Sequence, residues 1–238
     1  MELKFIPKSA LEVFGEKIFF LLVENFSETY FVGGMVRDIL LGKKVNDIDI
    51  TTKAVPKQVV KLLQNSGIKF SDHNSEYGII TATREELSVE IATFRQDIYR
   101  KNRYPKVRYE ESAEIDSQRR DFTINALYFS LNTGKIYDYN NGINDIRGKI
   151  LRFIGDPELR IKEDALRSLR ALRFAGDLNL KIESKSADAI KQRQDLVKKL
   201  TASRIEKEIL KCKFTKTKNL IKKFLCDPKA LDKFIFFS

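Results

Sequence analysis

The sequence predicts an α+β fold: a head with a mixed β-sheet and flanking helices over residues 1–150, followed by an all-helical region over residues 151–238. Up to about residue 150, short stretches with alternating apolar residues lie between stretches whose apolar residues repeat at helical spacing. From Glu158 onward strand signals become scarce and helix-forming residues dominate. With 238 residues, 42% of them apolar, the chain can bury an ordinary core in one large domain or two modest ones.

The elements of the head follow from these patterns in chain order. Gly33 and Gly34 form a turn from the first strand into the second helix, Gly42 ends that helix, and Pro56 starts the third. A polar turn joins the last two strands. We expect helices over residues 9–26, 35–41 and 56–64, and strands over residues 30–32, 47–52, 78–84 and 88–94.

Residues 95–114 are mostly polar and charged, with one proline and little periodicity. We therefore expect a long surface loop there, and loops of that length are often functional. Beyond this loop, the boundary between the head and the helical region is expected near residue 150.

The net charge of the chain indicates a polyanionic partner. The formal charge is +11 and the pI is about 9.5, although charge alone does not distinguish RNA from DNA, an acidic protein or a membrane surface. Residues 197–238 hold 12 Lys or Arg against 4 Asp or Glu, so about +8 of the charge lies there. Such a stretch is typical of a face that grips a nucleic-acid backbone, and the alternative is a solvated, lysine-rich helical surface.

Several classes of protein are disfavoured. Cys212 and Cys226 lack a CxxC spacing and His73 is the single histidine, so neither a zinc site nor a disulfide framework is indicated. The longest apolar run, residues 18–23, is far shorter than the roughly 20 residues of a membrane span, and no signal-peptide cleavage site follows it. We expect a cytoplasmic protein with reduced thiols and no membrane partner.

Asp47-Ile48-Asp49 is the candidate catalytic motif. Side chains two residues apart on a strand point to the same face, so the two carboxylates would lie side by side while Ile48 and Ile50 point into the core. The repulsion between the carboxylates is costly unless a cation neutralises it, and hard oxygen ligands favour Mg²⁺. By itself, so short a motif fits two exposed strand carboxylates at least equally well.

A glycine turn about 13 residues earlier favours the catalytic interpretation. Gly33 and Gly34, at a strand-to-helix turn, let a phosphate approach the backbone, and the free N–H groups at the start of the helix supply positive potential. Arg37, one helical turn further on, could add a fork of donors to the same phosphates.

Four longer motifs occur between residues 31 and 175. They are FVGGMVRDILLGKKVNDIDITT (residues 31–52), RRDFTINAL (119–127), YDYNNGINDIRGKILRFIGDPELRI (137–161) and EDALRSLRALRFA (163–175). In this order they resemble the motifs of class II tRNA nucleotidyltransferases, the bacterial-type CCA-adding enzymes and their poly(A) polymerase relatives. LTASRIEKEILK (200–211) is similar to the fifth, helical motif of that family. The apolar motif residues are expected in the core rather than as base-stacking platforms: Phe122, Ile124, Leu127 and Phe174.

The resemblance implies a polymerase-β-like nucleotidyltransferase head and a helical neck that reads the base. It implies template-independent addition of CMP or AMP, taken from CTP or ATP, to an RNA 3′ end. In this chemistry Asp47 and Asp49 hold Mg²⁺ in a two-metal transfer, the RNA 3′-hydroxyl attacks the α-phosphate and pyrophosphate leaves in line.

The resemblance also assigns nucleotide ligands outside the aspartate pair. Gly34 and Arg37 would contact the triphosphate or the sugar, and Arg120, in the second motif, would touch the bound nucleotide. For Arg120 the alternative is a structural ion pair with Asp121 or Asp116.

The fourth motif offers a candidate base reader. Asp164 and Arg167 are three residues apart, and on a helix they would share a face. Asp164 could accept from the exocyclic amino group of cytosine or adenine while Arg167 donates to the ring nitrogen, whereas uracil and guanine present a carbonyl to the carboxylate. The resemblance implies that this pair selects C and A, and that Arg170 and Arg173 are further ligands. Nine residues rotate Arg173 to the side opposite Asp164, so a structural ion pair is its alternative.

The chain departs from the family pattern in its length. Family members continue past the fifth motif into body and tail regions that grip the tRNA elbow, whereas this chain ends at Ser238 and could at best grip the acceptor stem. We expect a naturally short enzyme, one piece of a split or decaying gene, or a chain shortened for crystallisation. In the family a flexible loop at the position of residues 95–114 is linked to the switch from C to A addition, so its presence favours addition of A.

We therefore predict an RNA 3′-terminal nucleotidyltransferase whose favoured acceptor is the CCA end of tRNA. The alternatives are a poly(A) polymerase, a catalytically idle RNA-binding remnant, and a nucleotidyltransferase acting on a small-molecule or protein hydroxyl. Retention of the charged groups in all four motifs argues against the remnant. The Asp164–Arg167 reader and the basic C-terminal stretch argue against the small-molecule enzyme. No residue pattern decides the oligomeric state.

Overall fold

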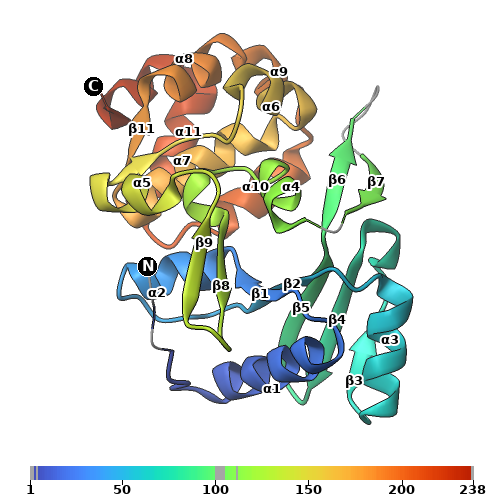
Figure 1. The fold of residues 1–238 in the computed structure, drawn as a ribbon. Coiled ribbons are helices and arrows are strands. Elements are labelled where there is room, and N and C mark those ends of the chain that lie inside the picture. The colour runs from blue at the N-terminus through green and yellow to red at the C-terminus, as the bar shows by residue number, and fades with distance from the viewer. Residues whose placement is uncertain (1–2, 4, 100–104, 111, 237–238) are drawn as a thin grey trace. The chain divides into compact units, whose positions relative to one another are not determined.

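The computed structural model describes the chain apart from residues 1–2, 4, 100–104, 111 and 237–238 (Figure 1). The described residues form two compact units. The first is built from the described residues within 3–99, 105–120 and 125–142, and the second from residues 121–124 and 143–236. The chain enters the second unit at Asp121, returns to the first at Asn125 and enters the second again at Ile143. The sequence predicted one boundary near residue 150.

A mixed seven-stranded sheet forms the first unit, as predicted. Its strand order is β3-β4-β5-β2-β1-β8-β9. β2 and β5 run parallel, and the other neighbouring strands run antiparallel. The strands are β1 (Thr29–Val32), β2 (Asp49–Thr52), β3 (Lys69–Ser71), β4 (Ile79–Arg84), β5 (Leu87–Thr93), β8 (Leu127–Ser130) and β9 (Lys135–Asp138).

The helices of the first unit begin where the sequence places caps. The Ser9 hydroxyl accepts the N–H of Glu12 at 3.2 Å and so caps the first helix, and Pro56 opens the third. The helices are α1 (Ala10–Asn25), α2 (Gly34–Leu40), α3 (Pro56–Asn65) and α4 (Ala113–Gln118), with a short 3₁₀ turn η1 (Ser75–Tyr77). A second 3₁₀ turn, η2 (Thr123–Asn125), spans the point where the chain returns from the second unit to the first.

The expected surface loop over residues 95–114 is wrong for the described part of that segment. β6 (Arg95–Ile98) and β7 (Lys106–Tyr109) pair antiparallel, and α4 follows at Ala113. Most residues of this two-stranded ribbon are charged or polar, so it carries no apolar alternation that would reveal its strands. The tip, residues 100–104, lies outside the described residues.

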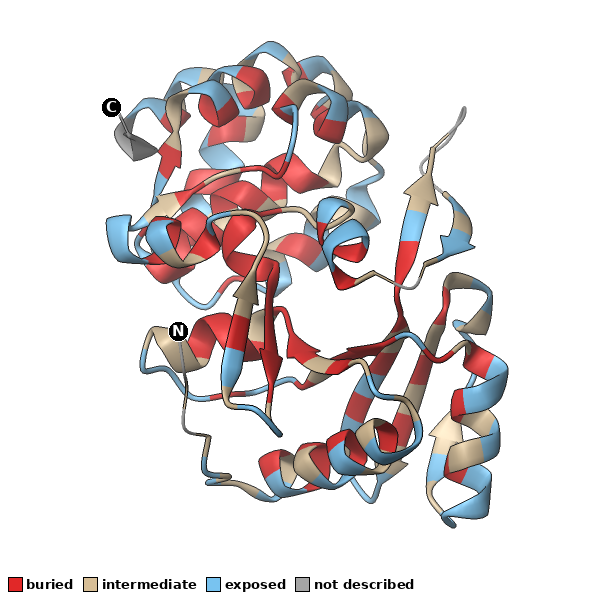
Figure 2. Ribbon diagram, viewed as in Figure 1, coloured by how far each residue is buried: buried red, intermediate tan, exposed pale blue. Residues whose placement is uncertain are grey.

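β1 carries the core of the first unit on both of its faces. Phe31 stacks on Phe19 of α1 with ring centroids 5.0 Å apart. Val32 points to the opposite face, where it packs with Phe94 and Tyr128. The buried positions, shown in red, accordingly run along the strands of the sheet (Figure 2). This two-sided burial fixes the end of β1, where the glycine turn begins.

The second unit is helical, as predicted, and also contains a small parallel sheet that the prediction of an all-helical region did not include. Its strands are β10 (Ile150–Leu151), β11 (Lys181–Glu183) and β12 (Ile235–Phe236), which are too short to show a sequence period. The helices are α5 (Gly142–Gly148), α6 (Pro157–Glu163), α7 (Leu166–Leu178), α8 (Ser184–Gln192), α9 (Gln194–Lys198), α10 (Ala202–Leu210) and α11 (Thr215–Cys226), followed by η3 (Pro228–Phe234).

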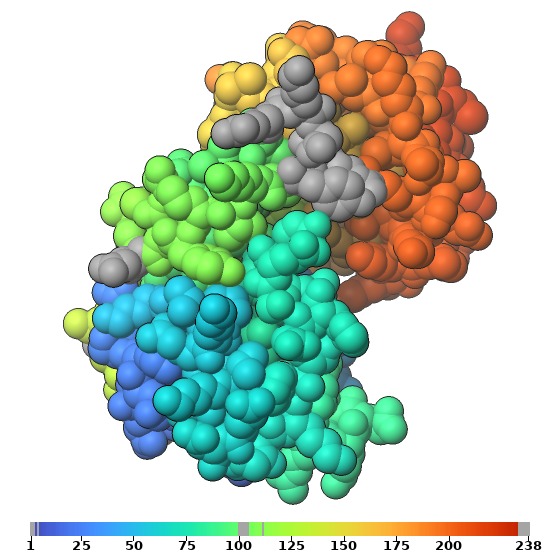
Figure 3. All heavy atoms as spheres, turned by 90° about the vertical axis from the view of Figure 1, so that its right-hand side faces the viewer, coloured from blue at the N-terminus to red at the C-terminus, as the bar shows by residue number. Residues whose placement is uncertain are grey.

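Burial agrees with the predicted core, and the basic stretch reaches the surface. Phe122, Ile124 and Leu127 are fully buried and Phe174 is 8% exposed, which confirms them as core residues. Residues near 200–225, in orange to red, contribute to the surface of the second unit (Figure 3). No helix in the described part of the chain has the length and apolar character that a membrane crossing demands.

Candidate active site

The glycine turn of the first unit lies next to one of the predicted carboxylates. β1 and β2 are antiparallel with Val32 opposite Asp49, so Gly33 follows β1 at the start of β2. The φ angle of Gly33 is +75°, and a Cβ there would lie 3.1 Å from Oδ2 of Asp49 and 3.8 Å from Nη1 of Arg120. Glycine is required at this position because it adopts the backbone angle without strain and leaves the carboxylate uncrowded.

The two aspartates alternate with isoleucines, as predicted, but differ in burial. Ile48 and Ile50 are 2% and 0% exposed, whereas Asp47 is exposed and Asp49 is half-buried. β2 begins only at Asp49, two residues later than predicted, although the Ile48 carbonyl already accepts an N–H from β5 at 3.1 Å. Asp47 therefore lies in the irregular segment that leads into the strand.

The electrostatic surroundings of Asp49 are dominated by burial and by neighbouring carboxylates. The pKa of Asp49 is raised to about 6, chiefly by burial and also by the negative charges of Glu90 and Asp47, while Arg120 and Arg37 act in the opposite direction. A divalent cation would relieve this excess of negative charge, and carboxylate oxygens suit a hard ion. In the described part of the chain no three His, Cys, Asp or Glu side chains gather into a metal cage, so the fit rests on the aspartate pair.

Glu90 is a site residue that sequence reasoning did not name. It lies opposite Asp49 in the parallel pairing of β2 with β5. After burial, the negative charge of Glu90 has the largest influence on the pKa of Asp49. The acidic residue within the alternating strand was visible in the sequence, but the register that brings it to Asp49 was not.

Arg37 lies close to the glycine turn. Its side chain is buried, and it donates from Nε to Asp38 at 2.8 Å and from Nη1 to Asn125 at 2.6 Å. A Cβ on Gly34, the first residue of α2, would lie 3.5 Å from Nη2 of Arg37. These contacts fix the guanidinium beside the turn, where the sequence placed it.

Arg120 reaches the same turn and also makes one of the two ion pairs that its structural alternative named. Nη2 lies 3.3 Å from Oδ2 of Asp116, and Nε donates to the Tyr128 hydroxyl at 3.0 Å. Burial alone would lower the pKa of Arg120, but Tyr128 and Asp116 hold that pKa above its ordinary value. Because Nη1 approaches Gly33, the ion pair and a contact with a ligand at the turn are compatible.

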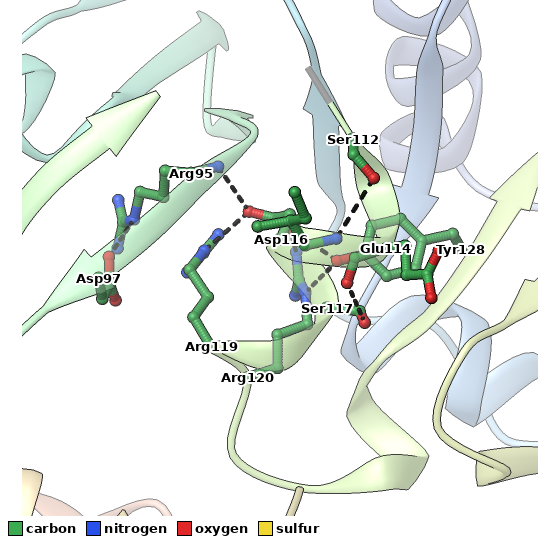
Figure 4. A network of polar contacts seen from close by, with 10 residues as sticks. Arg95, Asp97, Ser112, Glu114, Asp116, Ser117, Arg119, Arg120 and Tyr128 are labelled. Carbon is green, nitrogen blue, oxygen red and sulfur yellow. Dashed lines mark hydrogen bonds and ion pairs between the residues drawn. The ribbon is translucent and has the colours of Figure 1, made fainter. Parts of the chain in front are cut away.

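Asp116 is the shared acceptor that holds Arg120 in place (Figure 4). Its carboxylate is completely buried. Oδ2 also accepts the Tyr128 hydroxyl at 2.6 Å, and Oδ1 accepts Nε of Arg119 at 2.7 Å and the backbone N–H of Arg95 at 3.1 Å. One carboxylate therefore joins α4, β8 and the base of the β6–β7 ribbon.

The predicted base reader of the second unit does not lie on one helix, so the prediction of a shared helical face is wrong. α6 ends at Glu163, α7 begins at Leu166, and Asp164 between them is extended, with φ −150° and ψ 106°. The cause is the side chain of Asp164, whose Oδ1 accepts the N–H of Leu166 at 3.1 Å. Aspartate bonds in this way to nearby backbone outside helices and favours helix starts.

Asp164 and Arg167 are bound to separate partners. Both oxygens of Asp164 accept from Nη2 of Arg204, at 2.8 and 3.1 Å. Arg167 is buried and donates from Nη1 to the Arg160 carbonyl at 2.8 Å and to the Glu163 carboxylate. Each proposed reader is thus held by charged or polar groups of its own.

Arg170 and Arg173 each form an ion pair, and both lie near the ring of Phe174. Arg170 donates to Asp121 at 2.6 and 2.8 Å, and Arg173 donates to the buried carboxylate of Glu208. Their guanidinium carbons lie 5.4 and 4.2 Å from the centre of the Phe174 ring. The structural ion pair named as the alternative for Arg173 is therefore present.

A mixed sheet that carries a glycine turn beside an aspartate pair defines a nucleotidyltransferase head. The family model described as the Poly A polymerase head domain matches residues 29–152, which is more than half of the chain. The chain belongs to this family.

Curated and solved relatives agree with the family. The CCA-adding enzyme of Lactobacillus helveticus is 44% identical over 186 residues, which are 77% of this chain and 45% of that protein. The structure of the Bacillus stearothermophilus CCA-adding enzyme in complex with CTP matches 85% of this chain and 48% of its own, at TM-score 0.73 and 32% identity. A tRNA nucleotidyltransferase complexed with a primer tRNA and an incoming ATP analog matches 87% and 59%, at TM-score 0.68 and 33% identity. The chain spans about half the length of the curated relatives it matches.

Proposed function

We propose that this chain carries the catalytic and nucleotide-selecting parts of a template-independent RNA nucleotidyltransferase. It would add CMP and AMP, from CTP and ATP, to the CCA end of tRNA in the cytoplasm. The observation that carries the proposal is the position of the half-buried Asp49 carboxylate, 3.1 Å from the Cβ position of Gly33 and beside Arg120. The relatives solved with CTP and with a primer tRNA support these substrates.

Asp47 and Asp49 are the proposed ligands of Mg²⁺, which when bound would stabilise the negative charge that develops on the transferred phosphoryl group. Gly33 and Gly34 leave the backbone open to a phosphate. Arg37 and Arg120, held by their buried partners, would direct positive charge toward it. These residues bind and orient the triphosphate, and the RNA supplies the attacking hydroxyl.

Asp164 and Arg167 are the proposed readers of the base. The carboxylate would accept the exocyclic amino group that cytosine and adenine share, and the guanidinium would donate to the ring nitrogen beside it. Arg170 and Arg173 are proposed as additional nucleotide ligands, since a guanidinium has five N–H donors and one ion pair does not use all of them.

The proposal is tested by incorporation of labelled CTP and ATP, with UTP and GTP as controls, into tRNAs that end before, within and just short of CCA. We expect Mg²⁺-dependent incorporation of C and A, which Asp49→Asn reduces by about a thousandfold or more. Asp188→Asn, an exposed carboxylate on α8, is the matched control and should retain activity. Incorporation that is indifferent to Mg²⁺ or to Asp49→Asn would contradict the proposal.

A second candidate is favoured by the name of the family model, the head domain of poly(A) polymerase. An RNA that ends in a short A tract separates the two candidates, because a poly(A) polymerase extends it into a ladder. A CCA-adding enzyme extends only the tRNAs, by at most three nucleotides. No incorporation into any RNA, with RNA binding intact, would identify an idle RNA-binding protein and contradict both.

A further inference from the structure

Arg204, on α10, is bound to the carboxylate to which the proposed function assigns base selection. Its Nη2 donates to both oxygens of Asp164, at 2.8 and 3.1 Å. The two side chains are 21% and 27% exposed, so the pair is largely shielded from water yet still reachable by a ligand. The contact joins residues 40 positions apart in sequence.

The contacts hold the Asp164 carboxylate in a single orientation. Arg204 binds both oxygens, while Oδ1 also accepts the N–H of Leu166 at 3.1 Å. A carboxylate offers about four acceptor positions, and these contacts use three of them. The remaining acceptor position lies on Oδ2. The direction in which it points is set by the position of Arg204.

The donor half of the reader is held by different groups. Arg167 donates to the Glu163 carboxylate and to the Arg160 carbonyl. A substitution of Arg204 therefore affects the acceptor, Asp164, directly. It leaves the contacts of the donor, Arg167, in place. This separation makes an effect on base choice distinguishable from a general loss of nucleotide binding.

We propose that Arg204 is a specificity-determining positioning residue, which holds the Asp164 carboxylate where it accepts an exocyclic amino group. The inference rests on the proposed role of Asp164. Cytosine presents its amino group at one edge position and uracil presents a carbonyl there, with its N–H one atom further along the ring. A carboxylate that Arg204 no longer holds turns toward the N–H of uracil, and the discrimination between the two bases falls.

The test compares Arg204→Met, which removes the ion pair, with Arg204→Lys, which keeps the charge but loses the guanidinium geometry. Lys207→Met is the matched control, because it removes an exposed charge from the same helix. Dissociation constants of CTP, ATP and UTP in Mg²⁺ are measured by equilibrium dialysis on the full chain, and kcat/KM is measured for each nucleotide on a tRNA that lacks its CCA end. Circular dichroism establishes that each variant is folded.

We expect the preference for CTP over UTP to fall about tenfold or more in Arg204→Met, less in Arg204→Lys and not at all in Lys207→Met. A wild-type preference in both Arg204 variants, or a loss of affinity that is equal for all nucleotides, would show that the ion pair only joins α10 to the α6–α7 junction. If Arg204→Met does not fold, Arg204→Lys decides in the same way. A wild-type chain that binds no nucleotide, or binds CTP, ATP and UTP alike, would overturn the proposed function together with this inference.

Discussion

Asp49 lowers the stability of the metal-free chain at neutral pH. Its pKa is raised from 3.8 to about 6, chiefly by burial, so the folded chain holds the proton more tightly than the unfolded chain does. Stability therefore falls as the pH rises from about 4 to about 6, and the full penalty is present above that window. We expect Asp49→Asn to raise the free energy of unfolding at pH 7.5 by on the order of 1–2 kcal/mol, measured by urea unfolding without metal.

The pH dependence is what identifies the cause of this gain. At pH 4 the Asp49 carboxyl is protonated in the folded chain and only about half ionised in the unfolded chain, so most of the advantage of the asparagine should disappear. Asp188→Asn, at an exposed position, serves as the control. A gain of equal size at pH 4 and pH 7.5 would mean that the ionised carboxylate is not its source.

Asp116 is a buried carboxylate that pairs with two arginines of the first unit. Burial alone would raise the pKa of Asp116, but Arg119, Arg120 and the Tyr128 hydroxyl outweigh it, so that pKa lies below its ordinary value. Its contribution to stability is thus present at neutral pH and is lost as the pH falls through the lowered pKa. We expect Asp116→Asn to lower the free energy of unfolding by about 3 kcal/mol or more, because two arginines lose their buried counter-ion.

Tyr128→Phe is the informative comparison for Asp116→Asn, since it removes the hydroxyl that donates to Asp116 and accepts from Arg120 but leaves the ion pairs. We expect a loss of about 1–2 kcal/mol in the same unfolding experiment. Equal losses in the two variants would indicate that the ion pairs of Asp116 contribute little beyond its hydrogen bond with Tyr128.

Single residues could be predicted from the sequence where the determining geometry is local. Gly33 and Asp49 are brought together by the antiparallel pairing of two strands that are close in sequence, and their spacing was visible. The contacts of Glu90 with Asp49 and of Arg204 with Asp164 depend on strand register and helix packing over 40 or more residues. Such long-range pairing leaves no periodic signal in one sequence.

At the scale of elements, α7 and α11 approach each other closely at one glycine. A Cβ on Gly176 would lie 2.6 and 2.7 Å from Oγ1 and Cγ2 of Thr217, a buried and branched side chain. We expect Gly176→Ala to lower the free energy of unfolding by about 1–3 kcal/mol through overpacking, as measured by urea unfolding. Combined with Thr217→Ala, which removes those two atoms, the substitution should cost much less. Additive losses in the double variant would contradict this contact.

The elements that sequence reasoning missed share a physical cause. The β6–β7 ribbon has too few apolar residues for alternation to mark it, and its strands are fixed by mutual pairing and by Asp116. The break at Asp164 was hidden because the surrounding residues favour helix, and the side chain that ends the helical pattern is the proposed base reader itself. Local propensity predicted α1, α2 and α3, where it agrees with the packing.

At the scale of the whole molecule, we expect the basic residues within 197–238 to affect RNA binding but not base selection. Three exposed lysines lie on α11: Lys216, Lys222 and Lys223. Each phosphate contact that is lost makes the slope of the log of the RNA-binding constant against the log of the salt concentration shallower by about 0.7–0.9. We expect replacement of these three lysines by glutamine to reduce the slope for a tRNA lacking its CCA end by about 2. The preference for CTP over UTP should not change, because α11 supplies none of the proposed reading residues.

The matched control for this experiment replaces three exposed lysines of the first unit, Lys53, Lys57 and Lys61, by glutamine. This replacement changes the net charge by the same amount. If net charge alone attracts the RNA, both triple variants will lose the same slope, because long-range attraction depends on total charge. If the C-terminal lysines contact phosphates, the α11 variant alone will lose it, since counterion release counts contacts rather than charges. Fluorescence anisotropy of labelled tRNA between about 50 and 200 mM salt distinguishes these outcomes. An equal loss of slope in both variants would mean that the basic stretch is a solvated, lysine-rich surface rather than an RNA-binding face.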